Sequence, residues 1–239
     1  MSWRPCKLFL VALLLVAAAS GNTCLASAGA LDYAAERAAM VRQLRRQGIQ
    51  NPRVLAAMGR VPRHLFFAQT DCLHAYDDCP LSIGSGRVAT PPYAVALMTQ
   101  LIGPQAGMRV LQVGIGSGYH SAVLADITPH VFVIDVRPTL TRAASDRLRA
   151  RGYSSVRCHT GRACQGWPEH APYDAIVVTC ATERVPVALI EQLREGGRLV
   201  IPIGRGPEQT LNCLRKSGGR LRADAGVQLH VSPMDCRPQ

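Results

Sequence analysis

Residues 109–135 read RVLQVGIGSGYHSAVLADITPHVFVID, and this stretch decides the fold. An apolar run leads into a glycine-rich turn, an amphipathic segment follows, and a second apolar run ends on Asp135. This order predicts a strand, a tight turn, a helix and a second strand that finishes in a carboxylate. The glycines of the turn are Gly114, Gly116 and Gly118.

The turn and the carboxylate together predict a ligand. Glycines allow the backbone to approach a ligand closely, and Asp135, 21 residues after Gly114, is well placed to bind ribose hydroxyls. A nucleoside-containing cofactor is therefore the leading hypothesis. The spacing is G-x-G-x-G, whereas the dinucleotide fingerprint is G-x-G-x-x-G, so spacing alone also allows a tight turn without a ligand.

From Arg109 onward, predicted strands and helices alternate along the chain. Alternation of this kind implies an α/β fold with a doubly wound, mostly parallel sheet and helices on both faces. A polar turn, Ser217-Gly218-Gly219, adds an antiparallel C-terminal hairpin. Strands are expected near 110–113, 131–135, 155–158, 174–179, 198–203, 209–215 and 226–232, with helices near 118–126, 138–151 and 186–194.

Three N-terminal helices are expected before the glycine turn. Asp32 can cap the first, Asn51 can cap the second with a proline after it, and Pro91-Pro92 opens the third. The first two helices are expected to end at Gly48 and Gly59, and residues 61–86 are expected to form turns.

The N-terminus has the order of a secretory signal. Arg4 and Lys7 precede an apolar run at 8–19, and Ala26-Ser27-Ala28 supplies an A-x-A cleavage site. The apolar run is shorter than the roughly 20 residues that span a bilayer. We therefore predict an exported protein, periplasmic or secreted, with no stable membrane insertion after cleavage. An uncleaved segment that anchors the protein to the membrane is the alternative.

The resulting domain organisation is simple. Residues 1–28 form the signal peptide and residues 29–239 form one domain. Within it, residues 29–105 make a helical part with a loop, and residues 106–239 make the α/β core.

Charge and cysteine content exclude some classes of function. The net charge of +11 falls to +9 without residues 1–28, which hold two basic residues and no acid. The arginines are scattered and no nucleic-acid-binding signature is present, so we expect no nucleic-acid partner. Seven cysteines remain after cleavage and none forms a C-x-x-C pair, so no metal site is expected. A disulfide between Cys72 and Cys79, or less readily between Cys158 and Cys164, stays open.

Short sequence words in a fixed order carry a resemblance that runs from Met40 to Met234. They are VPRH at 61–64, PYAVALM at 92–98, VLQVGIGSGY at 110–119, GWPE at 166–169 and GRLVIPIG at 197–204. Together these words resemble the protein-L-isoaspartate O-methyltransferase family.

The resemblance implies an S-adenosylmethionine-dependent enzyme. Its substrate would be an L-isoaspartyl residue in a damaged protein or peptide, and its product a methyl ester of the α-carboxyl group. The ester then closes to a succinimide, which can reopen as normal aspartate. A carboxylate is already ionised at neutral pH, so the reaction needs alignment rather than a general base. We expect the protein to be a monomer.

The resemblance also implies roles for individual residues. Gly114, Gly116 and Gly118 would pass under the methionine portion and sugar of the cofactor, and Asp135 would accept both ribose hydroxyls. The active-site loop of the family reads roughly G-Q-T-I-S-Q-P-Y, and this chain has GRVATPPY at 86–93. Thr90 therefore stands at the active-site serine, although it could instead simply cap the following helix. Asp135 could likewise be a plain strand-end acid.

Three departures from the family pattern affect the same site. Gln112 replaces a glutamate near the amino end of the cofactor, and Arg87-Val88 replace a Gln-Thr pair. Arg162 stands where an aspartate of G-D-G recognises the adenine amino group, and arginine cannot accept a hydrogen bond. The changes at Gln112, Thr90 and Arg162 motivate a second hypothesis, a non-catalytic binding or scaffold protein with this fold. An NAD-dependent oxidoreductase is the third.

Overall fold

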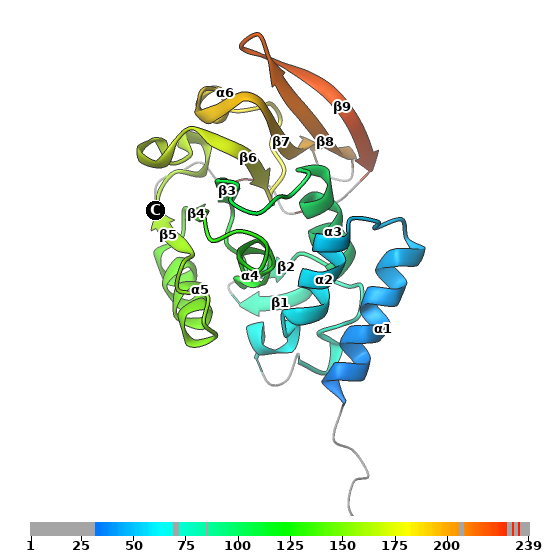
Figure 1. The fold of residues 1–239 in the computed structure, drawn as a ribbon. Coiled ribbons are helices and arrows are strands. Elements are labelled where there is room, and N and C mark those ends of the chain that lie inside the picture. Colours follow the sequence, from blue (N-terminus) through cyan, green and yellow to red (C-terminus); the bar gives the residue numbers. More distant parts are fainter. Residues whose placement is uncertain are drawn as a thin grey trace, which may run out of the picture. The chain divides into compact units, whose positions relative to one another are not determined.

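The computed structural model describes residues 32–68, 72–84, 86–205, 208–228, 231 and 234, and its centre is a seven-stranded sheet. The strand order is β5-β4-β3-β6-β7-β8-β9. Strands β3, β4, β5, β6 and β7 are parallel to one another. Strands β8 and β9 extend the sheet beyond β7 as an antiparallel hairpin (Figure 1). The predicted fold class is confirmed. The strands are β3 (Val110–Val113), β4 (Val131–Asp135), β5 (Arg157–Thr160), β6 (Tyr173–Val178), β7 (Leu193–Arg205), β8 (Glu208–Ser217) and β9 (Arg220–Gln228).

Side chains of the central strands alternate between two hydrophobic cores, as the two-residue period of a strand requires. In β3, Val110 packs in one core, whereas Leu111 and Val113 pack in the other. The first core lies under five helices and the second under α6 and short 3₁₀ turns. These helices are α1 (Tyr33–Arg46), α2 (Pro52–Arg60), α3 (Pro92–Leu101), α4 (Tyr119–Ala125), α5 (Pro138–Ala150) and α6 (Val187–Gln192).

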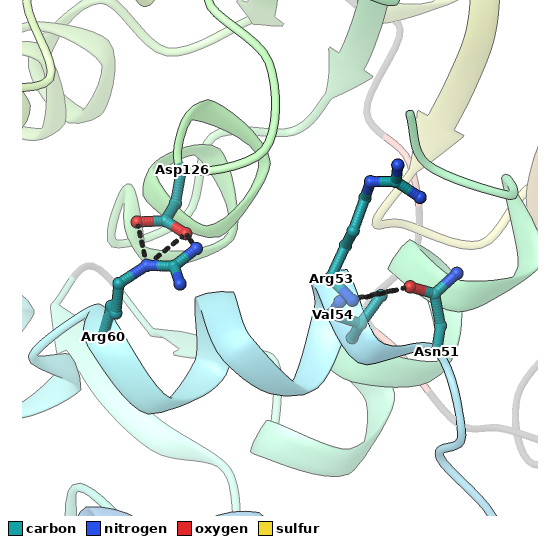
Figure 2. A network of polar contacts seen from close by, with 5 residues as sticks. All are labelled: Asn51, Arg53, Val54, Arg60 and Asp126. Atoms are coloured by element: carbon teal, nitrogen blue, oxygen red, sulfur yellow. Dashed lines mark hydrogen bonds and ion pairs between the residues drawn. The ribbon is translucent and has the colours of Figure 1, made fainter. Parts of the chain in front are cut away.

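The N-terminal helices begin where their capping residues predict. The Asp32 carboxylate accepts hydrogen bonds from two backbone N–H groups at the start of α1. The Asn51 side chain does the same at the start of α2, where Oδ1 accepts from Arg53 and Val54 (Figure 2). Such caps satisfy donors that the first turn leaves unpaired.

One ion pair ties this helical part to the α/β core. Arg60, the last residue of α2, donates from Nε to both carboxylate oxygens of Asp126 at 3.1 and 3.0 Å, and from Nη2 to one of them (Figure 2). The hydrogen bonds to Asp126 raise the pKa of Arg60. Because Asp126 caps the C-terminal end of α4, the contact fixes α2 against the helix that follows the glycine turn.

Some predicted boundaries are wrong. Residues 61–86 are not all turns, since β1 (Leu81–Gly84) pairs with β2 (Arg87–Ala89), after 3₁₀ turns at Arg63–Phe66 and Cys72–His74. Helix α2 continues one residue past Gly59, which keeps helical backbone. Strand β5 begins at residue 157 rather than 155.

The last strand shows the largest boundary error. Gly218 and Gly219 both have positive φ angles, +60° and +74°, so a two-residue turn closes the hairpin. Two glycines with positive φ suit such a turn, and they let the return strand start at once. Strand β9 therefore begins at Arg220, whereas its apolar residues had placed it near 226–232.

Other predictions fall at the edge of what the structure covers. The predicted signal peptide lies outside the described residues, which form one compact unit that begins at Asp32. In the described part of the chain, no helix combines the length and apolar character needed to cross a membrane. No disulfide joins the six described cysteines, so neither of the pairings considered above is present among them.

Candidate cofactor and active site

A cavity of about 850 Å³ opens at the carboxyl ends of β3, β4 and β6. The chain runs outward from β3 through β4 to β5, then returns to the other side of β3 with β6, so the order reverses between β3 and β6. In open α/β sheets, ligands bind in the crevice at such a reversal. One side of the cavity is lined by residues 80, 83, 87–91 and 95, and we call it the Thr90 side. Another, the glycine side, is lined by residues 112, 114–117, 119, 120, 135, 136 and 140.

Gly114 occupies a position that admits no other residue without movement. Its φ angle is +94°, and a Cβ atom built there would lie 2.4 Å from Oγ1 of Thr179. Thr179 Oγ1 is fixed, since it lies 3.1 Å from the carbonyl oxygens of both Val113 and Gly114. Backbone strain and the close contact therefore both require glycine.

The other two glycines of the turn have different surroundings. At Gly116, φ is +55° and no atom lies within 4 Å of a built Cβ, so its backbone borders open cavity. Gly118 does not line the cavity. Its built Cβ would lie 3.4 Å from Leu148 and 3.5 Å from Ala144, both on α5. Gly118 thus permits the packing of the turn on α5, whereas Gly114 and Gly116 form the cavity wall.

Asp135 ends β4 and lines the cavity, as predicted for a ribose-binding carboxylate. Its Oδ2 accepts a hydrogen bond from the Ile115 N–H at 2.9 Å, and its Oδ1 accepts from the Arg137 N–H at 3.0 Å. A carboxylate has about four lone-pair sites, so two remain for a ligand. Asp135 therefore holds the glycine turn in place and can still accept two hydroxyl groups.

Gln112 is buried beneath the turn, and both ends of its amide form hydrogen bonds. Nε2 donates to the Gly114 carbonyl oxygen at 2.7 Å, and Oε1 accepts from the Ser121 hydroxyl at 2.8 Å. A carboxylate could not donate the first of these bonds. The amide is thus matched to this turn, and the departure from glutamate strengthens the turn rather than breaking it.

His120 is a cavity-lining residue that sequence reasoning did not single out. Thr99 Oγ1 donates to the Val95 carbonyl at 2.7 Å and lies 3.0 Å from His120 Nε2. Because the threonine hydrogen is used, Nε2 must carry the proton and Nδ1 is a bare acceptor. Nδ1 is buried and has no hydrogen-bond partner in the part of the chain that the structure describes.

Burial keeps this histidine neutral. It lowers the pKa of His120 to about 3, so the ring carries no charge at neutral pH. A buried acceptor without a partner is costly unless a ligand or water satisfies it. Nδ1 is shielded from solvent although the ring lines the cavity, so His120 forms part of the wall rather than a binding contact.

Thr90 lines the cavity at the end of β2, and its backbone is held by a buried arginine. Arg63 donates from Nη2 to the Thr90 carbonyl at 3.0 Å and from Nε to the Ala75 carbonyl at 2.7 Å. Its guanidinium also lies 4.7 Å from the ring centroid of Tyr119. Burial lowers the pKa of Arg63 to about 10, so the group stays charged at neutral pH.

The helix-cap alternative for Thr90 is not seen. Pro91 is the N-cap residue of α3, and no side-chain hydrogen bond caps this helix within the described residues. The Thr90 hydroxyl is thus not committed to the helix that follows.

Arg162 lies beside the cavity rather than in its wall. Its side chain is exposed, while the next residue, Ala163, lines the cavity. The Gly161 N–H donates to the Asp135 backbone carbonyl at 3.0 Å, which places this loop next to Asp135. The predicted site residues therefore gather at one cavity except Gly118 and Arg162, which stand behind it and beside it.

The residues present fit S-adenosylmethionine. Asp135 offers acceptors for ribose hydroxyls, and Gly116 leaves its backbone open to the cavity. In the described ranges, no group of three or more metal-ligating side chains gathers at one point.

Comparison with known sequences identifies similar proteins. A model of the family "Protein-L-isoaspartate(D-aspartate) O-methyltransferase (PCMT)" matches residues 35–233. Protein-L-isoaspartate O-methyltransferase 2 of Syntrophobacter fumaroxidans is 40% identical over 237 residues, which cover 93% of this chain and 94% of the relative. The protein-L-isoaspartate O-methyltransferase of Roseiflexus castenholzii is 43% identical over 204 residues, covering 85% and 94%.

Solved structures show the same fold at lower identity. A protein-L-isoaspartate O-methyltransferase superposes with a TM-score of 0.75 at 24% identity, over 83% of this chain and 66% of that one. A Plasmodium falciparum protein ascribed to the same methyltransferases, solved with S-adenosyl-L-homocysteine, gives 0.73 at 22% identity, over 83% and 98%. The sequence matches span both the Thr90 side and the glycine side of the cavity, and on their extent the chain belongs to the protein-L-isoaspartate (D-aspartate) O-methyltransferase family.

Proposed function

We propose that this protein methylates the α-carboxylate of L-isoaspartyl residues in damaged proteins and so starts their repair. The observation that carries the proposal is that Thr90, the glycine turn and Asp135 line one cavity at the strand-order reversal. The scaffold alternative is not favoured, because the glycine side keeps its turn and its carboxylate, Asp135, despite the changes at Gln112 and Arg162.

Each part of the cavity has a role in this reaction. When bound, S-adenosylmethionine supplies a methyl group on a positively charged sulfur, which leaves as the neutral thioether of S-adenosylhomocysteine. Asp135 would accept the ribose hydroxyls, and the neutral ring of His120 would form part of the wall. The Thr90 hydroxyl can donate a hydrogen bond to one oxygen of the substrate carboxylate and so orient the other. Apolar residues exclude water, among them Ile83, Val88, Val95 and Leu140.

No residue has to act as a general base. The acceptor carboxylate is ionised at neutral pH, so the protein needs only to align it. The ester then loses methanol as the neighbouring backbone nitrogen closes a succinimide, and hydrolysis opens that ring to aspartate or isoaspartate.

A matched pair of peptides tests the proposal. One peptide contains L-isoaspartate and the other contains normal aspartate at the same position, and both are incubated with S-adenosylmethionine labelled in the methyl group. We expect a base-labile methyl ester on the isoaspartyl peptide alone. Transfer to neither peptide, by a protein that binds S-adenosylhomocysteine, would overturn the proposal.

Thr90 supplies a variant for the same assay. Thr90→Val keeps the shape and removes the hydroxyl, so kcat should fall about tenfold to a hundredfold, which corresponds to the roughly 1.5–3 kcal/mol of a hydrogen bond to a charged group. Thr90→Ser, which keeps the hydroxyl, is the matched control. Equal kcat for the valine and serine variants would remove Thr90 from the reaction.

We propose further that the protein is exported and acts as a monomer. The basic start, short apolar run and A-x-A site within residues 1–28 support export. Cell fractionation with N-terminal sequencing should find a chain that begins at Gly29 outside the cytoplasm, and light scattering should give the mass of one chain. A chain that retains Met1 in the membrane fraction would favour the anchor instead.

A further inference from the structure

The cavity carries more positive than negative charge. Four arginines line it, against two carboxylates. Methyl transfer to a carboxylate needs one acidic group on the substrate, and the lining offers more cationic groups than that reaction requires. The arginines are Arg63, Arg87, Arg184 and Arg205, and the carboxylates are Asp135 and Glu183.

Two of these arginines already have partners. Arg63 is fully buried and bound to the carbonyl oxygens of Ala75 and Thr90. Arg205 forms an ion pair with Glu183, with Nη2 2.6 Å from Oε2. The remaining two, Arg87 and Arg184, make no ion pair or hydrogen bond through their guanidinium groups within the described residues.

These two arginines come from segments on different parts of the cavity wall. Arg87 is half-buried in β2, three residues before Thr90, and its neighbour Val88 is half exposed. Arg184 is exposed in the loop after β6, two residues after Thr182, which also lines the cavity. Both guanidinium groups can therefore be reached by a peptide that enters the cavity toward Thr90.

We infer that Arg87 and Arg184 select isoaspartyl peptides that carry an additional acidic side chain next to the isoaspartate. This inference rests on the proposed function and names the substrate class of that same site. The second carboxylate is the better partner for the arginines. A cation held on the reacting carboxylate would stabilise the ground state and slow the transfer, whereas one held on a neighbour strengthens binding only. Arginine also binds carboxylates with a planar, two-pronged geometry.

The test compares peptides that differ in charge alone. Each contains L-isoaspartate flanked on both sides by glutamate or, in its twin, by glutamine. With the wild-type protein at low salt, KM for the acidic peptide should be roughly three- to tenfold lower, as expected of one or two partly exposed ion pairs. The difference should shrink as salt screens the charges.

Variants assign the preference to the two arginines. In Arg87→Gln/Arg184→Gln the ratio of the two KM values should approach one. Arg42→Gln/Arg46→Gln, which removes the same two charges from exposed positions of α1 away from the cavity, should keep the wild-type ratio. Thermal unfolding confirms that each variant is folded before the comparison.

The possible results are distinguishable. Methylation of both peptides with equal KM, or with a lower KM for the neutral peptide, would overturn the inference and leave the proposed function intact. A preference that survives the double substitution would also overturn it. Methylation of neither peptide would overturn the proposed function, and the inference with it.

Discussion

The glycine side and the Thr90 side of the cavity are built in different ways. On the glycine side, the turn after β3 is held by hydrogen bonds with neighbouring side chains, those of Asp135, Gln112 and Thr179. On the Thr90 side, a short two-stranded sheet leads to Thr90, whose backbone is held by Arg63 from 27 residues earlier in the chain. The comparison indicates a glycine side held by neighbouring residues and a Thr90 side whose position depends on one buried arginine.

Asp135→Ala tests the glycine side and should have the largest effect. It removes the acceptor of two ribose hydroxyls and of two backbone N–H groups. Hydrogen bonds to charged groups contribute about 1.5–3 kcal/mol each, so affinity for S-adenosylhomocysteine should fall at least about a hundredfold. Titration calorimetry measures this, with Asp146→Ala on the surface of α5 as control. A loss below tenfold would mean that Asp135 does not bind the ribose.

Arg63→Gln tests the Thr90 side. It leaves the buried carbonyl groups of Ala75 and Thr90 without their donor, so the free energy of unfolding should drop by about 2–4 kcal/mol. Urea denaturation measures the drop, and Arg42→Gln should change stability by less than about 0.5 kcal/mol. Affinity for S-adenosylhomocysteine should fall far less than in Asp135→Ala. An equal fall in affinity in Arg63→Gln and Asp135→Ala would show that the two sides do not act independently.

His120, on the glycine side, makes stability depend on pH. Burial lowers its pKa to about 3, while in the unfolded chain it protonates near 6.5. Below pH 6.5 the unfolded state therefore binds the proton and the folded state does not, so stability falls with acidification. The wild type should lose about 2 kcal/mol more between pH 7 and pH 5 than His120→Gln. Parallel pH profiles of the two proteins would show that burial does not lower the pKa of His120.

Arg162→Asp should have the smallest effect. The loop touches the cavity through Ala163, but the arginine side chain is exposed, so an aspartate there would gain at most one hydrogen bond to adenine. Affinity for S-adenosylhomocysteine should rise about two- to tenfold. Arg157→Asp, an equal charge change at an exposed position of β5, is the control. Unchanged affinity would place the adenine away from this loop.

The glycine side could be predicted from sequence because its signals are local. The turn, the end of β4 and the helix between them lie within 27 residues, and each has a residue pattern of its own. The boundaries of β3 and β4 were correct for this reason. Strand β9 was misplaced because two glycines allow an immediate return, which apolar periodicity does not register.

The remaining site residues depend on contacts between distant segments. The bond from Arg63 to Thr90 and that from Thr99 to His120 both join elements that local patterns treat separately. Nothing around Arg184 in the sequence marks it as a cavity residue. Only the fold brings Arg184 to the same cavity as Arg87.

The most direct test of the central claim is a calorimetric titration of the protein with S-adenosylhomocysteine. A prebuilt glycine side predicts one site per chain with a dissociation constant on the order of micromolar, despite the changes at Gln112 and Arg162. No binding up to millimolar concentration, in a protein shown to be folded, would contradict the claim that this side of the cavity is a working cofactor site.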